Sequence, residues 1–200
     1  MTTAAKAKTL IGLYEAPEIL RVVNVWDVVS ARAVAKLPET KAIATAGHGI
    51  AASFGFEDGT ISRDIMIDMV GRIAASVSVP VTADLDDGYG DAGETTRLAI
   101  GAGVVGANIE DRLKPFDESV AAVEAIVKAA EAEGVPFALN ARTDAFVRAA
   151  TALSRKASRM RSSAAGRSST PEPPRCSCRE CSTPTSPASS SRVSAKASSA

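Results

Sequence analysis

A regular alternation of short apolar runs with helical patterns limits the folds open to this sequence more than any other feature. Five runs rich in β-branched residues, each ending in polar or glycine residues, are RVVNVWD, KAIATAG, VPVTADLD, VGANIED and PFALNARTD. Helical patterns lie between them. Near-continuous apolar strands that alternate with helices are typical of a parallel sheet covered by helices. The pattern therefore predicts an α/β fold with about five strand–helix units.

Two of the helical segments carry boundary signals. In SRDIMIDMVGRIAASV, Ser62 is a predicted N-cap before a stripe at helical spacing, formed by Ile65, Met66, Met69, Val70 and Ile73. In DESVAAVEAIVKAAEAEG, acids occupy the first turn and Gly134 predicts the end of the helix. The apolar stripe of this second helix is Val120, Val123, Ile126, Val127 and Ala130.

The alternation stops at about residue 150, and the composition changes there. Residues 1–150 hold 14 of the 23 basic and 21 of the 23 acidic residues, a net charge of −7, so residues 151–200 carry +7. The second region is rich in Ser, Arg and Pro, and its larger aliphatic residues are Leu153, Met160 and Val193. So little apolar area cannot offset the chain entropy, and residues 151–200 are predicted to be a disordered tail.

Two functions are conceivable for this tail, and both have weak support. A basic Ser- and Arg-rich segment suggests nucleic-acid binding, and Cys176, Cys178 and Cys181 form a C-x-C-x-x-C pattern that suggests a metal site. Three sulfurs without a nearby histidine make an incomplete metal site, and the tail has no aromatic residue for stacking. We expect no nucleic-acid partner. A shifted reading frame in a GC-rich gene is a further hypothesis for this composition.

The sequence contains no membrane or secretion signal. No apolar run approaches the roughly 18 residues of a membrane span. The N-terminus MTTAAKAKTL lacks the long apolar segment of a signal peptide. All three cysteines lie in the tail, so the body has no thiol chemistry of its own. These observations predict a cytoplasmic protein with no membrane partner.

Polar residues follow each of the five predicted strands. Because the loops after parallel strands gather at one end of the sheet, we expect these residues to meet there. The strand ends are Trp26-Asp27, Ala46-Gly47-His48-Gly49, Asp84-Leu85-Asp86-Asp87, Glu110-Asp111-Arg112 and Asn140-Ala141-Arg142-Thr143-Asp144.

Three acids crowd the end of the third predicted strand. If strand geometry continues to the end of this run, Asp84 and Asp86 point to one side and Asp87 to the other. Carboxylate oxygens from neighbouring strand ends are suitable ligands for Mg²⁺ or Mn²⁺, so Asp84, Asp86 and Glu110 are candidate metal ligands. Arg142 is a candidate clamp for a substrate carboxylate.

Ordinary structural roles are the alternative for the same residues. Asp at a strand end often caps the next helix, and Asp87 before GYG is a plausible turn former. Glu110–Arg112 and Asp144–Arg142 are plausible surface ion pairs.

Four stretches occurring in order over roughly residues 10–148 resemble the isocitrate lyase/phosphoenolpyruvate mutase superfamily. They are NVWDVVSARAVAKL…KAIATAGHGIAASFGFEDG, TADLDDGYG, GANIEDR and NARTDAF. The resemblance implies an incomplete (β/α)8 TIM-type barrel in residues 1–150, with the last three units and a helix exchanged between subunits missing. It also implies a Mg²⁺-dependent lyase-type enzyme that breaks or forms a C–C or P–C bond next to a 2-oxo acid through a metal-stabilised enolate. The family forms homo-oligomers.

By position, the resemblance assigns a role to each site residue. Asp84, Asp86 and Glu110 are expected to hold Mg²⁺, and Arg142 to contact the bound 2-oxo acid. The substrate carboxylate is expected to meet the loop of Ala46, Gly47 and His48, with His48 a loop residue rather than a proton-transfer group. Asp58 is expected to face the site, so the expected catalytic residues are Arg142, Asp58 and Glu110. Trp26 is expected to pack at the mouth.

The loop after the Glu-Asp pair departs from the best-known members of that superfamily. It contains DRLKPFDES, without the cysteine motif of isocitrate and methylisocitrate lyases. Phe116 and Glu118 stand where the phosphonate-forming mutases have Lys and Asn. An oxaloacetate-like 2-oxo or dicarboxylic acid is the expected substrate. The competing hypothesis is a truncated, non-catalytic fragment that retains the site residues and aggregates through its open sheet edge.

Overall fold

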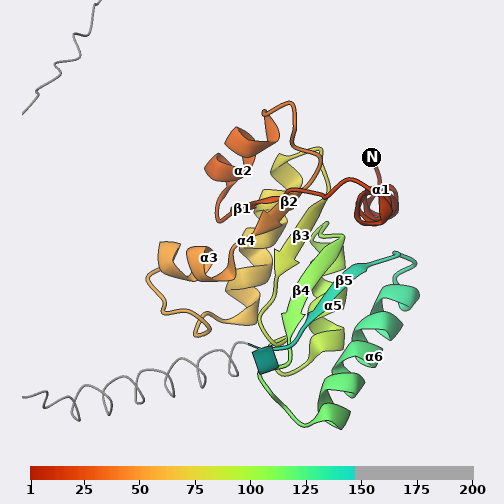
Figure 1. Ribbon diagram of the computed structural model, residues 1–200. Helices are drawn as coiled ribbons and strands as arrows, with labels where there is room; N and C mark the ends of the chain where they lie inside the picture. Colours follow the sequence, from red (N-terminus) through yellow and green to blue (C-terminus); the bar gives the residue numbers. More distant parts are fainter. Residues whose placement is uncertain (147–200) are drawn as a thin grey trace, which may run out of the picture. The chain divides into compact units, whose positions relative to one another are not determined.

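The computed structural model of the chain describes residues 1–146, which form one parallel five-stranded sheet (Figure 1). The strands pair in chain order, so each new strand adds to the same edge of the sheet. They are β1 (Val23–Val25), β2 (Ile43–Thr45), β3 (Val81–Asp84), β4 (Gly106–Glu110) and β5 (Ala138–Arg142). Each lies inside one of the predicted apolar runs. The prediction of an α/β fold with a five-unit partial barrel is confirmed.

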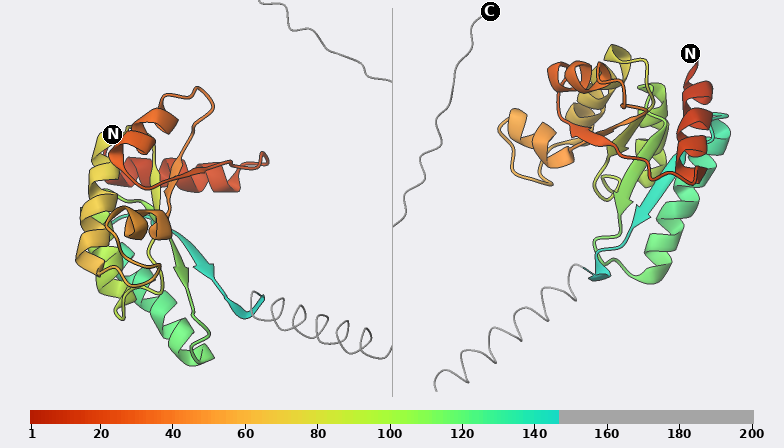
Figure 2. Two further views of the ribbon diagram at one scale, coloured as in Figure 1. Left: turned by 90° about the vertical axis from the view of Figure 1, so that its left-hand side faces the viewer. Right: turned by 45° about the horizontal axis from the view of Figure 1, so that its top comes forward.

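Six helices accompany these strands in the described residues. They are α1 (Thr3–Glu15), α2 (Val28–Ala35), α3 (Gly47–Ser53), α4 (Arg63–Ser76), α5 (Ala92–Gly101) and α6 (Phe116–Ala132). Helices α4, α5 and α6 lie side by side along one face of the sheet (Figure 2). Both predicted boundary signals are confirmed. The Ser62 hydroxyl accepts a hydrogen bond from the Ile65 amide at 3.5 Å, and Gly134 has the left-handed φ of 65° common just beyond a helix end.

The main core fills the space between the sheet and these helices. Ile43 and Val81 of the central strands are fully buried, as are Met66, Val70 and Ile73 of the predicted α4 stripe. Apolar strands therefore meet the apolar face of an amphipathic helix, as the two periodicities predict.

A second, smaller core lies near the amino-terminal ends of the strands, where α1 packs. Ala7 and Leu10 of α1 are fully buried and cluster with Val105, Val135 and Ala138, which flank or begin β4 and β5. Gly106 permits this contact, because a Cβ at that position would lie 2.9 Å from a Leu10 methyl carbon and 2.7 Å from the Ala138 carbonyl oxygen. Helix α1 thus covers the end of the sheet opposite the predicted site.

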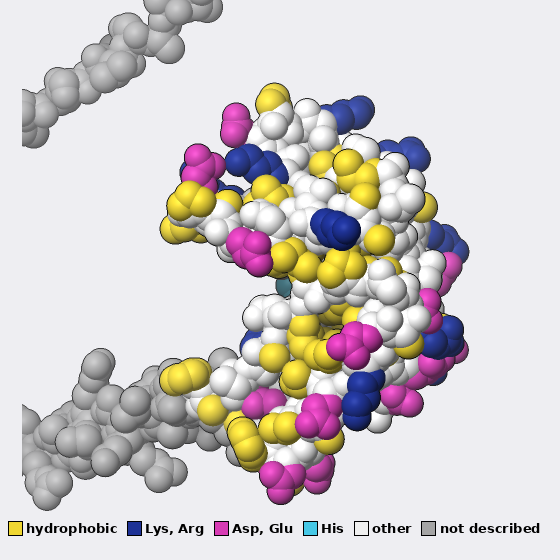
Figure 3. All heavy atoms as spheres, turned by 90° about the vertical axis from the view of Figure 1, so that its right-hand side faces the viewer, with side chains coloured by type: hydrophobic (Ala, Val, Ile, Leu, Met, Phe, Trp, Pro, Cys, Tyr) yellow, Lys and Arg dark blue, Asp and Glu magenta, His cyan; other side chains and the backbone are white. Residues whose placement is uncertain are grey.

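The apolar stripe of α6 is covered only in part. Ile126 and Ala130 are buried, but Val120 is 39% exposed and Val127 is 45% exposed. Figure 3 shows hydrophobic side chains exposed on the side of the molecule where α6 lies. Within residues 1–146, none of the six helices follows β5 in the chain to pack against the exposed part of the α6 stripe, so this face remains open.

The predicted tail, residues 151–200, lies outside the described residues, and so does its cysteine pattern, Cys176, Cys178 and Cys181. Among the helices of residues 1–146, none combines the length and the apolar character that crossing a membrane would require.

Candidate active site

A row of polar side chains crosses the sheet at the level where β3 ends. The register pairs Asp84 with Asn108 and Asn108 with Asn140. The Asn140 amide donates to the Asn108 side-chain oxygen at 2.8 Å, and the Asn108 amide donates to Asp84 Oδ1 at 3.4 Å. The backbone amide of Asp84 donates to the Thr45 hydroxyl at 3.0 Å. Neighbouring strands therefore fix the position of the Asp84 carboxylate.

A second row follows two residues further along β4 and β5. Glu110 pairs in register with Arg142, and the two residues project to the same side as Asn108 and Asn140 because strand residues alternate. The Arg142 guanidinium donates to Glu110 Oε2, and it also contacts Asp144 Oδ1 at 3.1 Å. The sheet thus brings the predicted acid and the predicted clamp together.

Asp86 reaches the site by a different route from the one we predicted. Strand β3 ends at Asp84, and Asp86 has a left-handed φ of 50°, so strand alternation does not place its side chain. Instead its carbonyl accepts a hydrogen bond from the Glu110 amide at 2.8 Å, and its carboxylate accepts one from the Tyr89 hydroxyl at 2.9 Å. The premise of continued strand geometry was wrong, because the chain turns immediately after Leu85.

Asp86 lies among other acids, with Arg112 as its basic neighbour at 3.6 Å. Burial raises the pKa of its carboxyl, and the like charges of Asp84 and Asp58 add to this, against the opposing effects of Tyr89 and Arg112. The Tyr89 hydroxyl also has a raised pKa, because it is buried beside Asp86. A cation placed among these acids would stabilise the ionised form of Asp86.

Asp87 points away from this group. Its carboxylate accepts hydrogen bonds from Lys114 at 2.8 Å and from the Tyr89 amide at 3.2 Å. Burial alone would raise the pKa of Asp87, but Lys114, Arg112 and the Tyr89 amide together lower it below its ordinary value. Gly88 then takes a φ of 82° close to α5, where a Cβ would lie 2.7 Å from the Ala92 methyl carbon. Asp87 therefore has a basic partner and a turn role.

Most of the predicted site residues line a single polar cavity of about 360 Å³ at the carboxyl ends of the strands. Its lining residues are His48, Asp58, Gly59, Asp84, Asp86, Glu110, Arg112 and Arg142. Four carboxylates and two guanidinium groups thus converge on one space, which we call the polar cavity. Asp58 comes to it from the loop before α4. His48 comes from the first turn of α3, so the prediction that it is a loop residue was wrong.

The backbone amides of Ala46 and Gly47 both have partners within the protein. The Ala46 amide donates to the Val25 carbonyl at 2.9 Å, and the Gly47 amide donates to Asp84 Oδ2 at 3.2 Å. A Cβ at Gly47 would lie 3.0 Å from the same oxygen, so glycine lets Asp84 approach the main chain. Binding of a substrate carboxylate by these amides remains a prediction. Trp26, predicted at the mouth, is 46% exposed and lies against Gly49.

Sequence reasoning missed three contributors to the polar cavity. Arg112, interpreted only as one half of a surface pair, lies 3.2 Å from Glu110 Oε1 and 3.6 Å from Asp86 Oδ1. Tyr89 and Asn108 hold the carboxylates of Asp86 and Asp84. A signal existed for Asn108, which stands two residues before Glu110 on the same strand face. Arg112 stood among the strand-end residues expected to meet, but without a role at the site, and nothing in the sequence identified Tyr89.

The donor set suits a hard divalent cation, although its oxygens are engaged with protein groups. Asp58, Asp84, Asp86 and Glu110 offer only carboxylate oxygens, which Mg²⁺ and Mn²⁺ prefer. As they stand, no three His, Cys, Asp or Glu side chains of residues 1–146 are arranged to hold a metal ion. The reason is visible in the contacts, since Glu110 is turned to two arginines and Asp86 to Tyr89 and Arg112. The carboxylates are suitable ligands for the ion, but Asp86 and Glu110 would have to exchange their present protein contacts for the ion.

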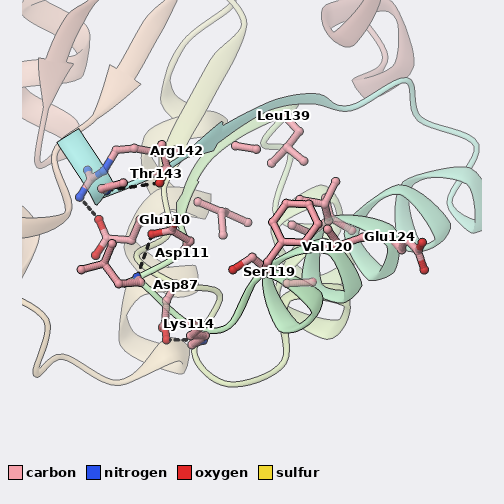
Figure 4. Close-up of a pocket in the computed structure, with 18 residues that line it drawn as sticks. Asp87, Glu110, Asp111, Lys114, Ser119, Val120, Glu124, Leu139, Arg142 and Thr143 are labelled. Carbon is pink, nitrogen blue, oxygen red and sulfur yellow. Dashed lines mark hydrogen bonds and ion pairs between the residues drawn. The ribbon is translucent and has the colours of Figure 1, made fainter. Parts of the chain in front are cut away.

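A second, larger cavity of about 680 Å³ lies beside the polar one, between α6 and the ends of β4 and β5. We call it the apolar cavity, because Ile109, Val123, Ile126 and Leu139 contribute to its walls. Figure 4 shows Val120 and Leu139 on either side of it, with the pairs Arg142–Glu110 and Asp87–Lys114 at its polar end. Glu110 and Arg142 line both cavities.

The chain belongs to the phosphoenolpyruvate phosphomutase family, whose model matches residues 10–166. A search of the curated proteins gave no match. Among solved structures, a provisionally named lyase/mutase from Burkholderia cenocepacia J2315 is 38% identical with a TM-score of 0.67, covering 70% of this chain and 55% of that one.

Two further solved structures have an assigned activity. A 2,3-dimethylmalate lyase, a member of the PEP mutase/isocitrate lyase superfamily, is 32% identical with a TM-score of 0.65, covering 72% of this chain and 52% of that one. An oxaloacetate acetylhydrolase, solved with the inhibitor 3,3-difluorooxalacetate, is 28% identical with a TM-score of 0.66, covering 72% of this chain and 55% of that one. The present chain therefore spans little more than half the length of these relatives.

Proposed function

We propose that the polar cavity is the active site of a Mg²⁺-dependent lyase-type enzyme that acts on an oxaloacetate-like 2-oxo acid. The observation that carries this proposal is the convergence of Asp84, Asp86 and Glu110 with Arg142 on one cavity at the strand ends. Two relatives support the substrate class, since one is named for 2,3-dimethylmalate and the other was solved with 3,3-difluorooxalacetate. Both are dicarboxylic acids.

The acidic and basic residues of the polar cavity would have different roles. Asp84, Asp86 and Glu110 would hold the ion, with Asp84 positioned by Asn108 and Thr45, and Asp86 by Tyr89. When bound, the ion supplies positive charge next to the carbonyl oxygen on which negative charge develops. With Glu110 holding the ion, the Arg142 guanidinium, which now contacts Glu110, would be available to bind the substrate carboxylate.

A non-catalytic chain is the second candidate, and a specific observation favours it. The face of α6 and β5 that adjoins Glu110 and Arg142 is apolar and open in the described residues. A catalytic group must be held to within about 0.5 Å by its supporting neighbours. Arg142 is 44% exposed beside this open face, so its support comes from one side. On this alternative the site binds a metal ion without turnover.

Product analysis on the 200-residue chain separates the two candidates. Oxaloacetate is incubated with protein and Mg²⁺, with protein and EDTA, and with Mg²⁺ alone, and the products are followed by NMR. The proposal expects turnover above the Mg²⁺ blank that Asp86→Ala removes and Asp87→Ala retains. Turnover that persists in EDTA or in Asp86→Ala would contradict it. Metal binding that depends on Asp86, without turnover on oxaloacetate or related 2-oxo acids, would establish the non-catalytic alternative.

A further inference from the structure

Arg112 makes contacts that conflict with the ion that the polar cavity would hold. Its guanidinium contacts Glu110 Oε1 at 3.2 Å and Asp86 Oδ1 at 3.6 Å. Asp86 and Glu110 are two of the three proposed metal ligands. A divalent cation between them would take the same oxygens and would repel the guanidinium. Arg112 and the ion therefore compete for one place.

Arg112 is held there by a loop rather than by the sheet. It follows the end of β4, and both Arg112 and Leu113 have left-handed φ values, 45° and 59°. Such conformations in residues other than glycine are strained and persist only where the surroundings impose them. The guanidinium extends to Gly59, where a Cβ would lie 3.2 Å from Nη2. Arg112 thus bridges the β4–α6 loop and the loop before α4 across the mouth of the cavity.

The other arginine of the cavity is anchored more firmly. Arg142 belongs to β5 and is paired in register with Glu110, and its guanidinium also contacts Asp144 at 3.1 Å. The two side chains are similarly exposed, 41% for Arg112 and 44% for Arg142, but Arg112 has no strand partner, so it can move into solvent without disturbing a strand. Of the two, Arg112 is the one whose departure leaves the sheet unchanged.

We propose that Arg112 is an internal counterion that holds Asp86 and Glu110 while no divalent ion is bound and leaves them when the ion binds. Arg112 thereby sets the metal affinity of the site. This inference rests on the proposed function only in taking Asp86 and Glu110 as metal ligands. It assigns Arg112 a positioning role in the metal-free protein and makes the β4–α6 loop the segment that responds to the metal.

The test measures Mn²⁺ binding by the 200-residue chain, using electron paramagnetic resonance to count free Mn²⁺. Arg112→Gln is expected to bind Mn²⁺ about three- to tenfold more tightly than the unaltered chain, which corresponds to losing a competing pair worth about 1 kcal/mol. Arg112→Lys keeps the positive charge but lacks the planar guanidinium that contacts both Asp86 and Glu110. It is expected to tighten Mn²⁺ binding less than Arg112→Gln does. The matched control is Lys114→Gln, on the same loop, whose lysine pairs with Asp87 instead.

Thermal unfolding gives a second readout that does not depend on activity. In EDTA, Arg112→Gln is expected to unfold at a lower temperature than the unaltered chain, because its clustered acids lose a counterion. Added Mg²⁺ is expected to raise the unfolding temperature more in Arg112→Gln than in the unaltered chain, because a tighter ligand stabilises more. Lys114→Gln should respond to Mg²⁺ as the unaltered chain does.

The outcomes separate this inference from the proposed function. If Asp86→Ala abolishes Mn²⁺ binding while Arg112→Gln binds no more tightly than the unaltered chain, the metal site stands and the counterion role is overturned. Weaker binding by Arg112→Gln also overturns it, since Arg112 would then support the metal ligands. Absence of Mn²⁺ binding in every variant, Arg112→Gln included, overturns both proposals.

Discussion

The polar and apolar cavities share Glu110 and Arg142 but differ in what forms their walls. The polar cavity is built from strand ends and loops, and its charged groups hold one another. The apolar cavity is built from one side of α6 and the flank of β4 and β5, where Val120 remains 39% exposed. The polar cavity has the features of a ligand-binding site, and the apolar cavity has those of a surface that packs against another element.

Residues next to each other in one loop line different cavities. Asp86 lines the polar cavity and Asp87 the apolar one, and the same division separates Arg112 from Lys114. The separation comes from the left-handed turns at Asp86 and Arg112, which direct neighbouring side chains to opposite sides. The loops after β3 and β4 thus place Asp86 and Arg112 in the polar cavity, and they place Asp87 and Lys114, which pair with each other, outside it.

The largest expected effect is on stability, and it compares a buried and an exposed side chain of the apolar cavity. Ile126→Ala should lower the free energy of unfolding by about 2–5 kcal/mol, because this side chain is buried in the main core. Phe116→Ala, in the same cavity, should change it by less than about 0.5 kcal/mol, because Phe116 is 81% exposed. Urea unfolding measures both. A large loss from Phe116→Ala would show that the face is covered.

Metal binding tests the division between the two consecutive acids. Asp86→Ala should weaken Mg²⁺ binding at least about 100-fold, since loss of an outer-shell partner alone typically costs 10- to 100-fold. Asp87→Ala should leave the affinity nearly unchanged, because its carboxylate pairs with Lys114. Calorimetric titration distinguishes them. Equal losses from the two substitutions would show that the cavities are not separate in function.

A smaller effect is expected from Tyr89→Phe, which deletes one hydrogen bond at the polar cavity. Loss of the contact with Asp86 should cost about 1 kcal/mol in either unfolding free energy or metal affinity. Measuring both shows which one the hydroxyl supports. A Tyr89→Phe chain indistinguishable from the original in both would mean that Asp86 is positioned by its backbone alone.

The smallest effect concerns pH and the Asp87–Lys114 pair. Because the pKa of Asp87 is lowered in the folded chain, its pair stabilises the fold above the unfolded pKa of about 3.9 and loses this effect as pH falls through the folded value. Lys114→Gln should therefore cost up to about 1 kcal/mol at pH 7 and less at pH 3. Urea unfolding at the two pH values measures this. A loss equal at both would exclude an ionic origin.

The pKa of Asp86 is shifted in the opposite direction to that of Asp87, so a titration of both carboxyls gives a further test. The folded pKa of Asp86 is raised, so its ionisation opposes folding, and this penalty shrinks as pH falls below the folded pKa and is gone below the unfolded value of about 3.9. Carboxyl NMR titration should find Asp86 ionising at a higher pH than Asp87. The reverse order would mean that the two turns do not separate the charges as described.

Regular elements were predictable because they depend on local composition. The five apolar runs gave the strands, and Ser62 and Gly134 marked helix ends through hydrogen bonding and a left-handed φ that the residue types favour. Helix α1 was not predicted. It is stabilised by burial of Ala7 and Leu10 against Val105 and Ala138, far away in the sequence, which no local pattern reveals.

Membership of the polar cavity was predictable, but its internal contacts were not. Strand ends and the family resemblance identified Asp84, Glu110 and Arg142, because the register of adjacent parallel strands brings them together. The position of Asp86 depends on a turn packed against Ala92, and that of Arg112 on space beside Gly59. Such contacts between loops distant in the sequence depend on the assembled fold.

The pairing of every strand with its neighbour in the sequence also affects how the chain folds. Val23 pairs with Ile43, Thr82 with Gly106 and Gly106 with Ala138, so each pairing closes a loop of a few tens of residues. Contacts of moderate sequence separation have a moderate entropic cost, and they can form in any order from either end. We therefore expect the sheet to assemble by stepwise addition of strand–helix units, with β3 and β4 able to form before either edge strand.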